Sequence, residues 1–327
     1  MKKMKAIVQR EYGEPEDVLS LEEIAPPEIG ENEVLIRVRS AGVDQGVWHL
    51  TAGLPYPVRA AGYGLRAPKN IVPGMDVAGI IEATGSAVDG LKPGDAVFGI
   101  AQGSFAELAR AEAEKIVLKP ESLSFEQAAA MSISGTTALE GLRDRCRVGP
   151  GQRVLILGAS GGVGGFAVQI AKALGAEVTG VASSEKLELV RSLGADHVID
   201  YKTEDFAQAR GSFDVIMDTG GNRSLTDIRR VLAPKGRLLI VGGESDGRWL
   251  GGTGRQLKAM ALSPFVSQTL GTFITSESGE DIHELKLMVE AGQIRPEVDR
   301  TFPLEEATSA IRYLRQGRAR GKVTISI

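Results

Sequence analysis

The most constraining feature of this sequence is a glycine-rich turn between an apolar run and a helical pattern. Residues 154–157 are all apolar, as expected of a short strand that is buried on both faces. Glycines interrupt the chain over residues 158–164, and apolar residues then recur at helical spacing until Gly175. A second apolar run follows at residues 178–182. This order of strand, turn, helix and strand predicts one unit of a nucleotide-binding α/β fold.

The turn itself predicts a site for a pyrophosphate. Backbone N–H groups at a helix N-terminus approach an anion closely only where no side chain intervenes, and the helix dipole adds attraction. The usual fingerprint G-x-G-x-x-G has alanine in its first position here, as Ala159-x-Gly161-x-x-Gly164. The flanking strand and helix favour nucleotide binding over a purely structural turn. The residues expected against the pyrophosphate are Ser160, Gly161, Gly162 and Val163.

Composition sets broad limits. A chain of 327 residues suggests about two domains, and 43% hydrophobic with 24% charged residues is typical of a globular protein. The net charge of -4 gives no reason to expect nucleic-acid binding. A lone cysteine, Cys146, excludes an intramolecular disulfide. With no apolar signal core and no membrane-length apolar run, the expected location is the cytoplasm, away from membranes.

The pattern divides the chain into two kinds of structure. Residues 1–119 read as short strands that form an antiparallel or mixed β-domain, interrupted by an irregular stretch at residues 41–73 that is long enough to be functional. Strands and helices alternate over residues 120–261, which predicts a doubly wound parallel sheet with ligand at the carboxyl ends of its strands. Residues 262–327 are assigned to the β-rich domain, since the last six residues look like a strand that returns to it.

The second strand of the nucleotide-binding unit indicates which dinucleotide binds. An NAD site carries Asp or Glu at the end of this strand, whereas this chain has Ser183, Ser184 and then Lys186. Hydroxyl and ammonium groups bind a 2′-phosphate through charge-assisted hydrogen bonds, and a carboxylate would repel it. The expected cofactor is therefore NADPH. The alternative, that these residues only cap the next helix, explains one serine but not the missing acid.

Three further motifs connect the chain to a known family. With the glycine turn, residues 74–79 (GMDVAG), 92–99 (KPGDAVFG) and 135–139 (GTTAL) resemble the zinc-independent quinone oxidoreductases of the medium-chain dehydrogenase/reductase superfamily. The resemblance covers essentially the whole chain. It implies a GroES-like catalytic domain, made from both ends of the chain, around a Rossmann domain. It also implies a homodimer.

The resemblance also implies roles for individual residues. It places Thr136 and Thr137 near the nicotinamide, with Gly242 and Gly243 beside the same end of the cofactor. It places Lys186 and Tyr201 at the 2′-phosphate, and Arg318 completes the phosphate site.

Two departures from related sequences bear on the chemistry. Zinc-dependent relatives read His-Glu where this chain has Met75 and Asp76, and one cysteine cannot make their metal sites, so no metal is expected. Quinone reductases often have Asn-Pro where this chain reads Asp44-Gln45. An ionised Asp44 only accepts hydrogen bonds. Asp44 therefore has a raised pKa, or binds the cofactor ribose, or is structural.

Without a metal, the easiest reaction is hydride transfer from NADPH to a quinone or an α,β-unsaturated ketone, whose product anion is delocalised. Trp48, Tyr56 and Tyr63 are the candidates to line the acceptor site, with Tyr63 as proton donor, although each is equally well read as an anchor for its loop. Two alternatives stay open: an enoyl-thioester reductase, and an NADPH-binding structural or regulatory protein with little turnover.

Overall fold

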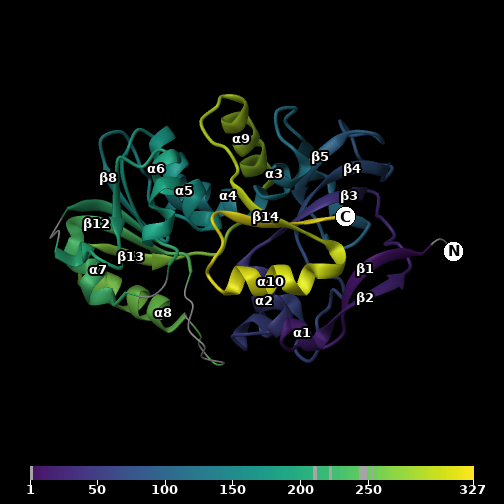
Figure 1. Ribbon diagram of the computed structural model, residues 1–327, viewed down its shortest axis with the longest axis horizontal. Coiled ribbons are helices and arrows are strands. Elements are labelled where there is room, and N and C mark those ends of the chain that lie inside the picture. The colour runs from purple at the N-terminus through teal and green to yellow at the C-terminus, as the bar shows by residue number, and fades with distance from the viewer. Residues whose placement is uncertain (1–2, 209–211, 221–222, 243–248, 250, 252) are drawn as a thin grey trace. The chain divides into compact units, whose positions relative to one another are not determined.

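The computed structural model describes residues 3–327 except 209–211, 221–222, 243–248, 250 and 252 (Figure 1). The chain divides into two compact units, each with its own sheet and hydrophobic core. Each unit is therefore a domain in the structural sense. Unit 1 comprises Met1–Thr136, Glu277–Ala291 and Pro296–Ile327, and unit 2 comprises Thr137–Ser276 and Gly292–Arg295.

Unit 2 is built on a parallel sheet. Among its described residues, six strands pair in the order β10-β9-β8-β11-β12-β13, and every pair is parallel (Figure 1). This arrangement confirms the predicted doubly wound sheet. It also adds a strand to the prediction, because β13 reads Thr-Leu-Gly-Thr and its one large apolar residue gives no strand pattern. The strands are β8 (Arg153–Leu157), β9 (Glu177–Ala182), β10 (His197–Asp200), β11 (Phe213–Asp218), β12 (Leu232–Ile240) and β13 (Thr269–Thr272).

Helices connect these strands. In Figure 1, α5 and α6 lie on one side of the sheet, and α7 and α8 lie on the other. The apolar face of α5, which includes the fully buried Ile170, packs on the sheet, and Gly175 follows the helix with a φ of 83°. The connecting helices are α5 (Gly162–Ala173), α6 (Leu187–Ser192), α7 (Leu225–Val231) and α8 (Thr253–Leu262), and α4 (Ser132–Glu140) precedes β8 in the chain.

Unit 1 is β-rich, as predicted. Its larger sheet has the order β14-β15-β3-β4-β5-β7, with β6 also paired to β3, and β1 and β2 form a separate antiparallel pair. The last strand, β15, runs antiparallel to β3 with Val323 opposite Val43, so both ends of the chain build one sheet. The strands are β1 (Met4–Gln9), β2 (Leu19–Ile24), β3 (Glu33–Val43), β4 (Asp76–Thr84), β5 (Ala96–Ile100), β6 (Leu108–Glu112), β7 (Ile116–Leu118), β14 (Val298–Pro303) and β15 (Lys322–Ser326).

The stretch at residues 41–73 is more ordered than the sequence predicts. Strand β3 continues to Val43, and helix α2 (Gln45–Ala52) follows at once. Asp44 caps this helix by accepting a hydrogen bond from Val47 N, and Gly53 ends it with a φ of 62°. A short π-helix, η1, follows at Arg59–Tyr63. The other helices of unit 1 are α1 (Pro15–Val18), α3 (Phe125–Ala129), α9 (Gly279–Glu290) and α10 (Ala307–Arg315).

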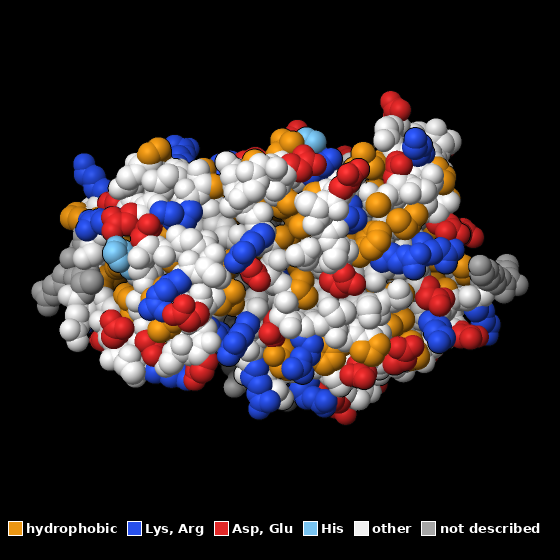
Figure 2. Space-filling model, turned by 45° about the horizontal axis from the view of Figure 1, so that its top comes forward, with side chains coloured by type: hydrophobic (Ala, Val, Ile, Leu, Met, Phe, Trp, Pro, Cys, Tyr) orange, Lys and Arg blue, Asp and Glu red, His pale blue; other side chains and the backbone are white. Residues whose placement is uncertain are grey.

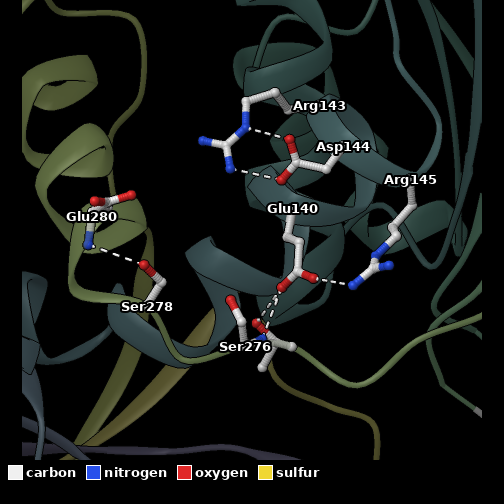
Figure 3. A network of polar contacts seen from close by, with 8 residues as sticks. Glu140, Arg143, Asp144, Arg145, Ser276, Ser278 and Glu280 are labelled. Atoms are coloured by element: carbon white, nitrogen blue, oxygen red, sulfur yellow. Dashed lines mark hydrogen bonds and ion pairs between the residues drawn. The ribbon is translucent and has the colours of Figure 1, made fainter.

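A buried carboxylate fixes the segment that leaves the sheet of unit 2. Figure 3 shows Glu140, at the end of α4, accepting hydrogen bonds from Arg145 Nη2 at 2.6 Å and Ser276 N at 2.9 Å. Thr275 Oγ1 donates to the same side chain at 3.1 Å. The side chain of Glu140 is 6% exposed, so this charge is stabilised by hydrogen bonds rather than by water.

Charges of both signs are interspersed over the face drawn in Figure 2. This distribution agrees with the small net charge of the chain. Within the described ranges, no helix is both long enough and apolar enough to cross a bilayer.

Candidate functional site

The glycine turn of unit 2 lies where the strand order of the sheet reverses. Strand β8 has β9 on one side and β11 on the other, and open α/β sheets bind ligands at the carboxyl ends of the strands at such a point. The ends of β8 and β11 are joined there, because Thr219 donates from N and from Oγ1 to Leu157 O, at 3.0 and 2.8 Å. The predicted turn therefore occupies the position that this topology reserves for a ligand.

The backbone of the turn leaves no room for a side chain at residues 158 and 164. Gly158 has a φ of 79°, and a Cβ on it would lie 2.6 Å from Thr219 Oγ1. A Cβ on Gly164 would lie 2.1 Å from Gly158 O, so only glycine lets helix α5 approach the turn this closely. Gly161 N already donates to Gly158 O at 3.0 Å. The N–H groups that remain for an anion are those of the first helical turn, from Gly162 and Val163 onward.

The ends of β11 and β12 form the other side of this point. Asp218 accepts from Gly220 N at 3.1 Å and pairs with Arg255 Nη1 at 2.6 Å. A Cβ on Gly242 would lie 2.9 Å from Thr219 O, so this predicted glycine packs closely against the same turn. Gly243 lies outside the described residues. The sequence places residues 218–220 at this edge of the sheet but does not predict the contacts of the Thr219 hydroxyl.

The ends of β9 and β10 bring together the residues predicted to select the cofactor. Ser183 is 8% exposed, and the short helix η4 (Ser184–Lys186) follows it. The Ser184 hydroxyl donates to Asp200 at the end of β10. Tyr201 is 55% exposed, and its N–H donates to Ala182 O at 3.2 Å. A carboxylate, Asp200, therefore stands beside the predicted serines, which the sequence pattern did not indicate.

In unit 1, the predicted proton donor lies near two carboxylates. Burial raises the pKa of Tyr63, and the charges of Glu277 and Asp44 raise it further. Burial also raises the pKa of Glu277, which the Lys115 ammonium at 4.0 Å opposes. Sequence reasoning missed Glu277, because it lies more than 200 residues away along the chain. Tyr63 therefore remains a neutral phenol, able to donate a proton, at physiological pH.

The other residues predicted for the acceptor site have structural partners. Trp48 Nε1 donates to Glu14 Oε2 at 3.3 Å, and Arg315 stacks on the indole at 3.8 Å from the ring centroid. The guanidinium of Arg59 lies 5.0 Å from the centroid of Tyr56. These contacts anchor α2, α10 and η1.

The residues predicted near the nicotinamide and the phosphate belong to different units. Thr136 is fully buried and belongs to unit 1; its hydroxyl donates to Ser132 O at 2.7 Å, and Thr137 begins unit 2. Arg318 is exposed in unit 1, near enough to lower the pKa of Tyr313, although the hydrogen bond from Tyr313 to Asp299 raises it more. Lys186 and Tyr201 belong to unit 2.

The position of the missing zinc ligands holds an ion pair instead. Asp76 and Lys322 are both buried, and Lys322 Nζ donates to Asp76 Oδ2 at 3.1 Å and to Ser134 Oγ at 2.9 Å. Ile133 N donates to the other carboxylate oxygen at 2.7 Å. Across the described residues, no group of three or more His, Cys, Asp and Glu side chains is placed to hold a metal ion.

Comparison with known proteins places this geometry in a family. Residues 30–121 match the family described as Alcohol dehydrogenase GroES-like domain, and residues 193–325 match the family described as Zinc-binding dehydrogenase. The 2-methylene-furan-3-one reductase of Solanum lycopersicum is 34% identical, over 98% of this chain and 79% of its own. The chloroplastic NADPH-dependent alkenal/one oxidoreductase of Arabidopsis thaliana is also 34% identical, over 99% and 80%.

Comparison with solved structures supports the same family assignment. The quinone oxidoreductase from Coxiella burnetii superposes with a TM-score of 0.86 at 29% identity, and the match covers 100% of both chains. A GroES-like unit combined with a dinucleotide-binding parallel sheet defines a class of two-domain oxidoreductases. The chain belongs to the medium-chain dehydrogenase/reductase superfamily. The predicted resemblance to the quinone oxidoreductases of this superfamily is thereby confirmed.

Proposed function

We propose that this oxidoreductase is a metal-free, NADPH-dependent reductase that transfers a hydride to a quinone or an α,β-unsaturated ketone. The observation that carries the proposal is the glycine turn at the end of β8, where Cβ atoms on Gly158 and Gly164 would lie only 2.1 to 2.6 Å from backbone or side-chain atoms. A pyrophosphate needs this close approach to backbone. The names of the relatives, which include an NADPH-dependent alkenal/one oxidoreductase and a quinone oxidoreductase, support the cofactor and the acceptor class.

The described residues fit a dinucleotide along its length. The first turn of α5, from Gly162 on, would hold the pyrophosphate, with Ser160 beside it. Ser183, Ser184, Lys186 and Tyr201 would hold the adenosine end, and Gly242 would leave room at the nicotinamide end. When bound, NADPH supplies the hydride from C4 of its nicotinamide.

The acceptor needs little help from the protein. A quinone or an enone spreads the charge of the added hydride over a conjugated system, so positioning and a proton donor suffice. Tyr63 is the proposed donor, because its raised pKa keeps the phenol protonated. Asp44 already accepts from Val47 N at 3.1 Å, which supports a structural role for it as the cap of α2.

The test is NADPH oxidation by chelator-treated protein with a panel of quinones, enones and enoyl thioesters, with NADH measured in parallel. We expect turnover with quinones or enones and a higher kcat/KM with NADPH than with NADH. Preference for enoyl thioesters would replace the proposed acceptor with an acyl carrier substrate. Tight NADPH binding without turnover on any acceptor would contradict the proposal in favour of a binding protein, and activity that requires added zinc would contradict the metal-free mechanism.

A further inference from the structure

Four charged side chains gather at the carboxyl ends of β9 and β10. Glu185 and Lys186 belong to η4, which follows β9, and Asp200 and Lys202 lie at and just after the end of β10. The two strands are neighbours, with Ala182 opposite Asp200 in the parallel register. This is the edge of the sheet at which the second strand of a dinucleotide fold contacts the adenosine ribose.

Two of these charges are carboxylates, which conflicts with binding a 2′-phosphate. The sequence argument for NADPH rested on the lack of an acid at the end of β9, yet Glu185 lies two residues after Ser183 and Asp200 accepts from Ser184. A free carboxylate at this edge repels a phosphate and favours the unphosphorylated ribose. The site therefore needs a group that offsets this negative charge.

Lys202 is that group. Its Nζ lies 2.6 Å from Glu185 Oε1, and its backbone N donates to Asp200 Oδ1 at 2.9 Å. Lys202 thus contacts both carboxylates, one through its side chain and one through its main chain. Hydrogen bonds from Lys202, which contributes most, from the backbone of Glu185 and from Ser183 lower the pKa of Glu185 to about 2, so the pair is fully charged at neutral pH. With Lys202 present, the four side chains carry a formal sum of zero rather than -1.

We propose that Lys202 is a specificity-determining residue for the cofactor, and that its ion pair with Glu185 makes the end of β9 compatible with a 2′-phosphate. The inference rests on the proposed function for the identity of the cofactor. Lys202 and Glu185 have side chains that are 46% and 55% exposed. Exposed pairs contribute little to folding, so removal of Lys202 changes the local charge without unfolding the sheet.

The test is calorimetric binding of 2′,5′-ADP and of 5′-AMP, which differ only by the 2′-phosphate, to wild type and to Lys202→Met. We expect Lys202→Met to weaken 2′,5′-ADP binding by about tenfold or more, because the uncovered Glu185 carboxylate then repels the 2′-phosphate, with 5′-AMP binding unchanged within about twofold. The difference in selectivity between wild type and Lys202→Met should become smaller at high salt, because salt screens these exposed charges. The double variant Lys202→Met with Glu185→Gln should regain most of the lost affinity, since the uncovered carboxylate is gone.

A matched control is Lys235→Met, which removes an exposed lysine from strand β12 of the same unit. It should leave the ratio of the two affinities unchanged. The inference would be overturned if Lys202→Met left the ratio of the affinities for 2′,5′-ADP and 5′-AMP unchanged, including by weakening both equally. It would also be overturned if the double variant recovered no affinity for 2′,5′-ADP. None of these measurements requires an acceptor substrate. If the protein discriminates the two nucleotides as expected but turns over no acceptor, the proposed function is refuted and the inference about Lys202 stands.

Discussion

Tyr63 is the residue whose chemistry is most open to direct test. Its phenol has a raised pKa, so it can donate a proton up to alkaline pH and loses this ability only as the pH rises through that pKa. Tyr63→Phe should lower kcat for an enone by about 100-fold, the lower end of what general acid catalysis contributes. We expect the kcat of wild type to fall above about pH 10 as the phenol ionises, and this fall should be absent in the variant. Steady-state kinetics across pH measure both effects.

Tyr313→Phe is the control for this experiment, because it removes a phenol of unit 1 that is hydrogen-bonded to Asp299 at 2.7 Å. It should leave the kcat unchanged. A Tyr63→Phe enzyme with wild-type kcat at every pH would mean that solvent supplies the proton.

Single residues were predictable where the backbone dictates the side chain. Only glycine fits at 158 and 164, so the sequence pattern locates the turn directly. Partners of polar side chains were not predictable, because they come from distant parts of the chain. No local sequence pattern predicts the hydrogen bond from Trp48 to Glu14, 34 residues away. The same is true of the hydrogen bond from Ser184 to Asp200, 16 residues away.

At the scale of elements, helix α5 offers a matched pair of glycines. Gly164→Ala places a Cβ 2.1 Å from Gly158 O and must push the helix away from the turn, whereas Gly165→Ala meets Leu193 Cδ1 at an ordinary 3.4 Å. We expect Gly164→Ala to weaken NADPH binding by at least about tenfold. Gly165→Ala should keep the affinity and raise stability by about 0.5–1 kcal/mol through helix propensity. Equal affinities of the two variants, measured by fluorescence titration, would refute the role of Gly164 as a point of close approach.

The hydrogen bonds of Glu140 predict a pH-dependent contribution to the stability of unit 2. Burial alone would raise its pKa, but the bonds from Ser276, Arg145 and Thr275 outweigh it and hold the pKa below the ordinary value. The folded pKa is thus lower than the unfolded one, so the carboxylate stabilises the fold above the unfolded pKa. This stabilisation is lost as the pH falls through the folded pKa.

Glu140→Gln should therefore lower the free energy of unfolding at pH 7 by about 1.5–3 kcal/mol, the range for a hydrogen bond to a charged group. The difference from wild type should shrink below about pH 4. Urea denaturation at several pH values measures it. Glu188→Gln, whose side chain is 88% exposed, is the control and should change stability by less than about 0.5 kcal/mol. A difference that stays constant with pH would rule out the carboxylate as its source.

Elements were predictable where hydrophobic periodicity is strong and were missed where it is weak. Strands β8 and β9 and helix α5 follow from apolar patterns. Helix α2 was hidden, because glycine at 46 and β-branched residues at 47 and 51 lower helix propensity, and its stability comes from the Asp44 cap and tertiary packing. The short β13 owes its place to pairing with β12.

At the scale of the whole molecule, the buried pair of Lys322 and Asp76 joins the last strand to the first sheet. Lys322→Met would leave Asp76, which is 0% exposed, as a buried charge without its partner. We expect a loss of about 3–5 kcal/mol in the free energy of unfolding. Adding Asp76→Asn should recover part of this loss, since no buried charge then remains. A single variant as stable as wild type in urea denaturation would show that water reaches the pair.

The antiparallel pairing of β15 with β3 also has a consequence for folding during synthesis, because the two strands are made at different times. A ribosome that adds about 5–20 residues per second completes β3 long before it makes β15, and all of unit 2 is synthesised in between. The nascent chain can thus finish its middle domain while one edge of β3 still lacks its neighbour, an exposure that invites aggregation. The five residues of β15, which follow unit 2 in the sequence, complete the sheet to which β3 belongs.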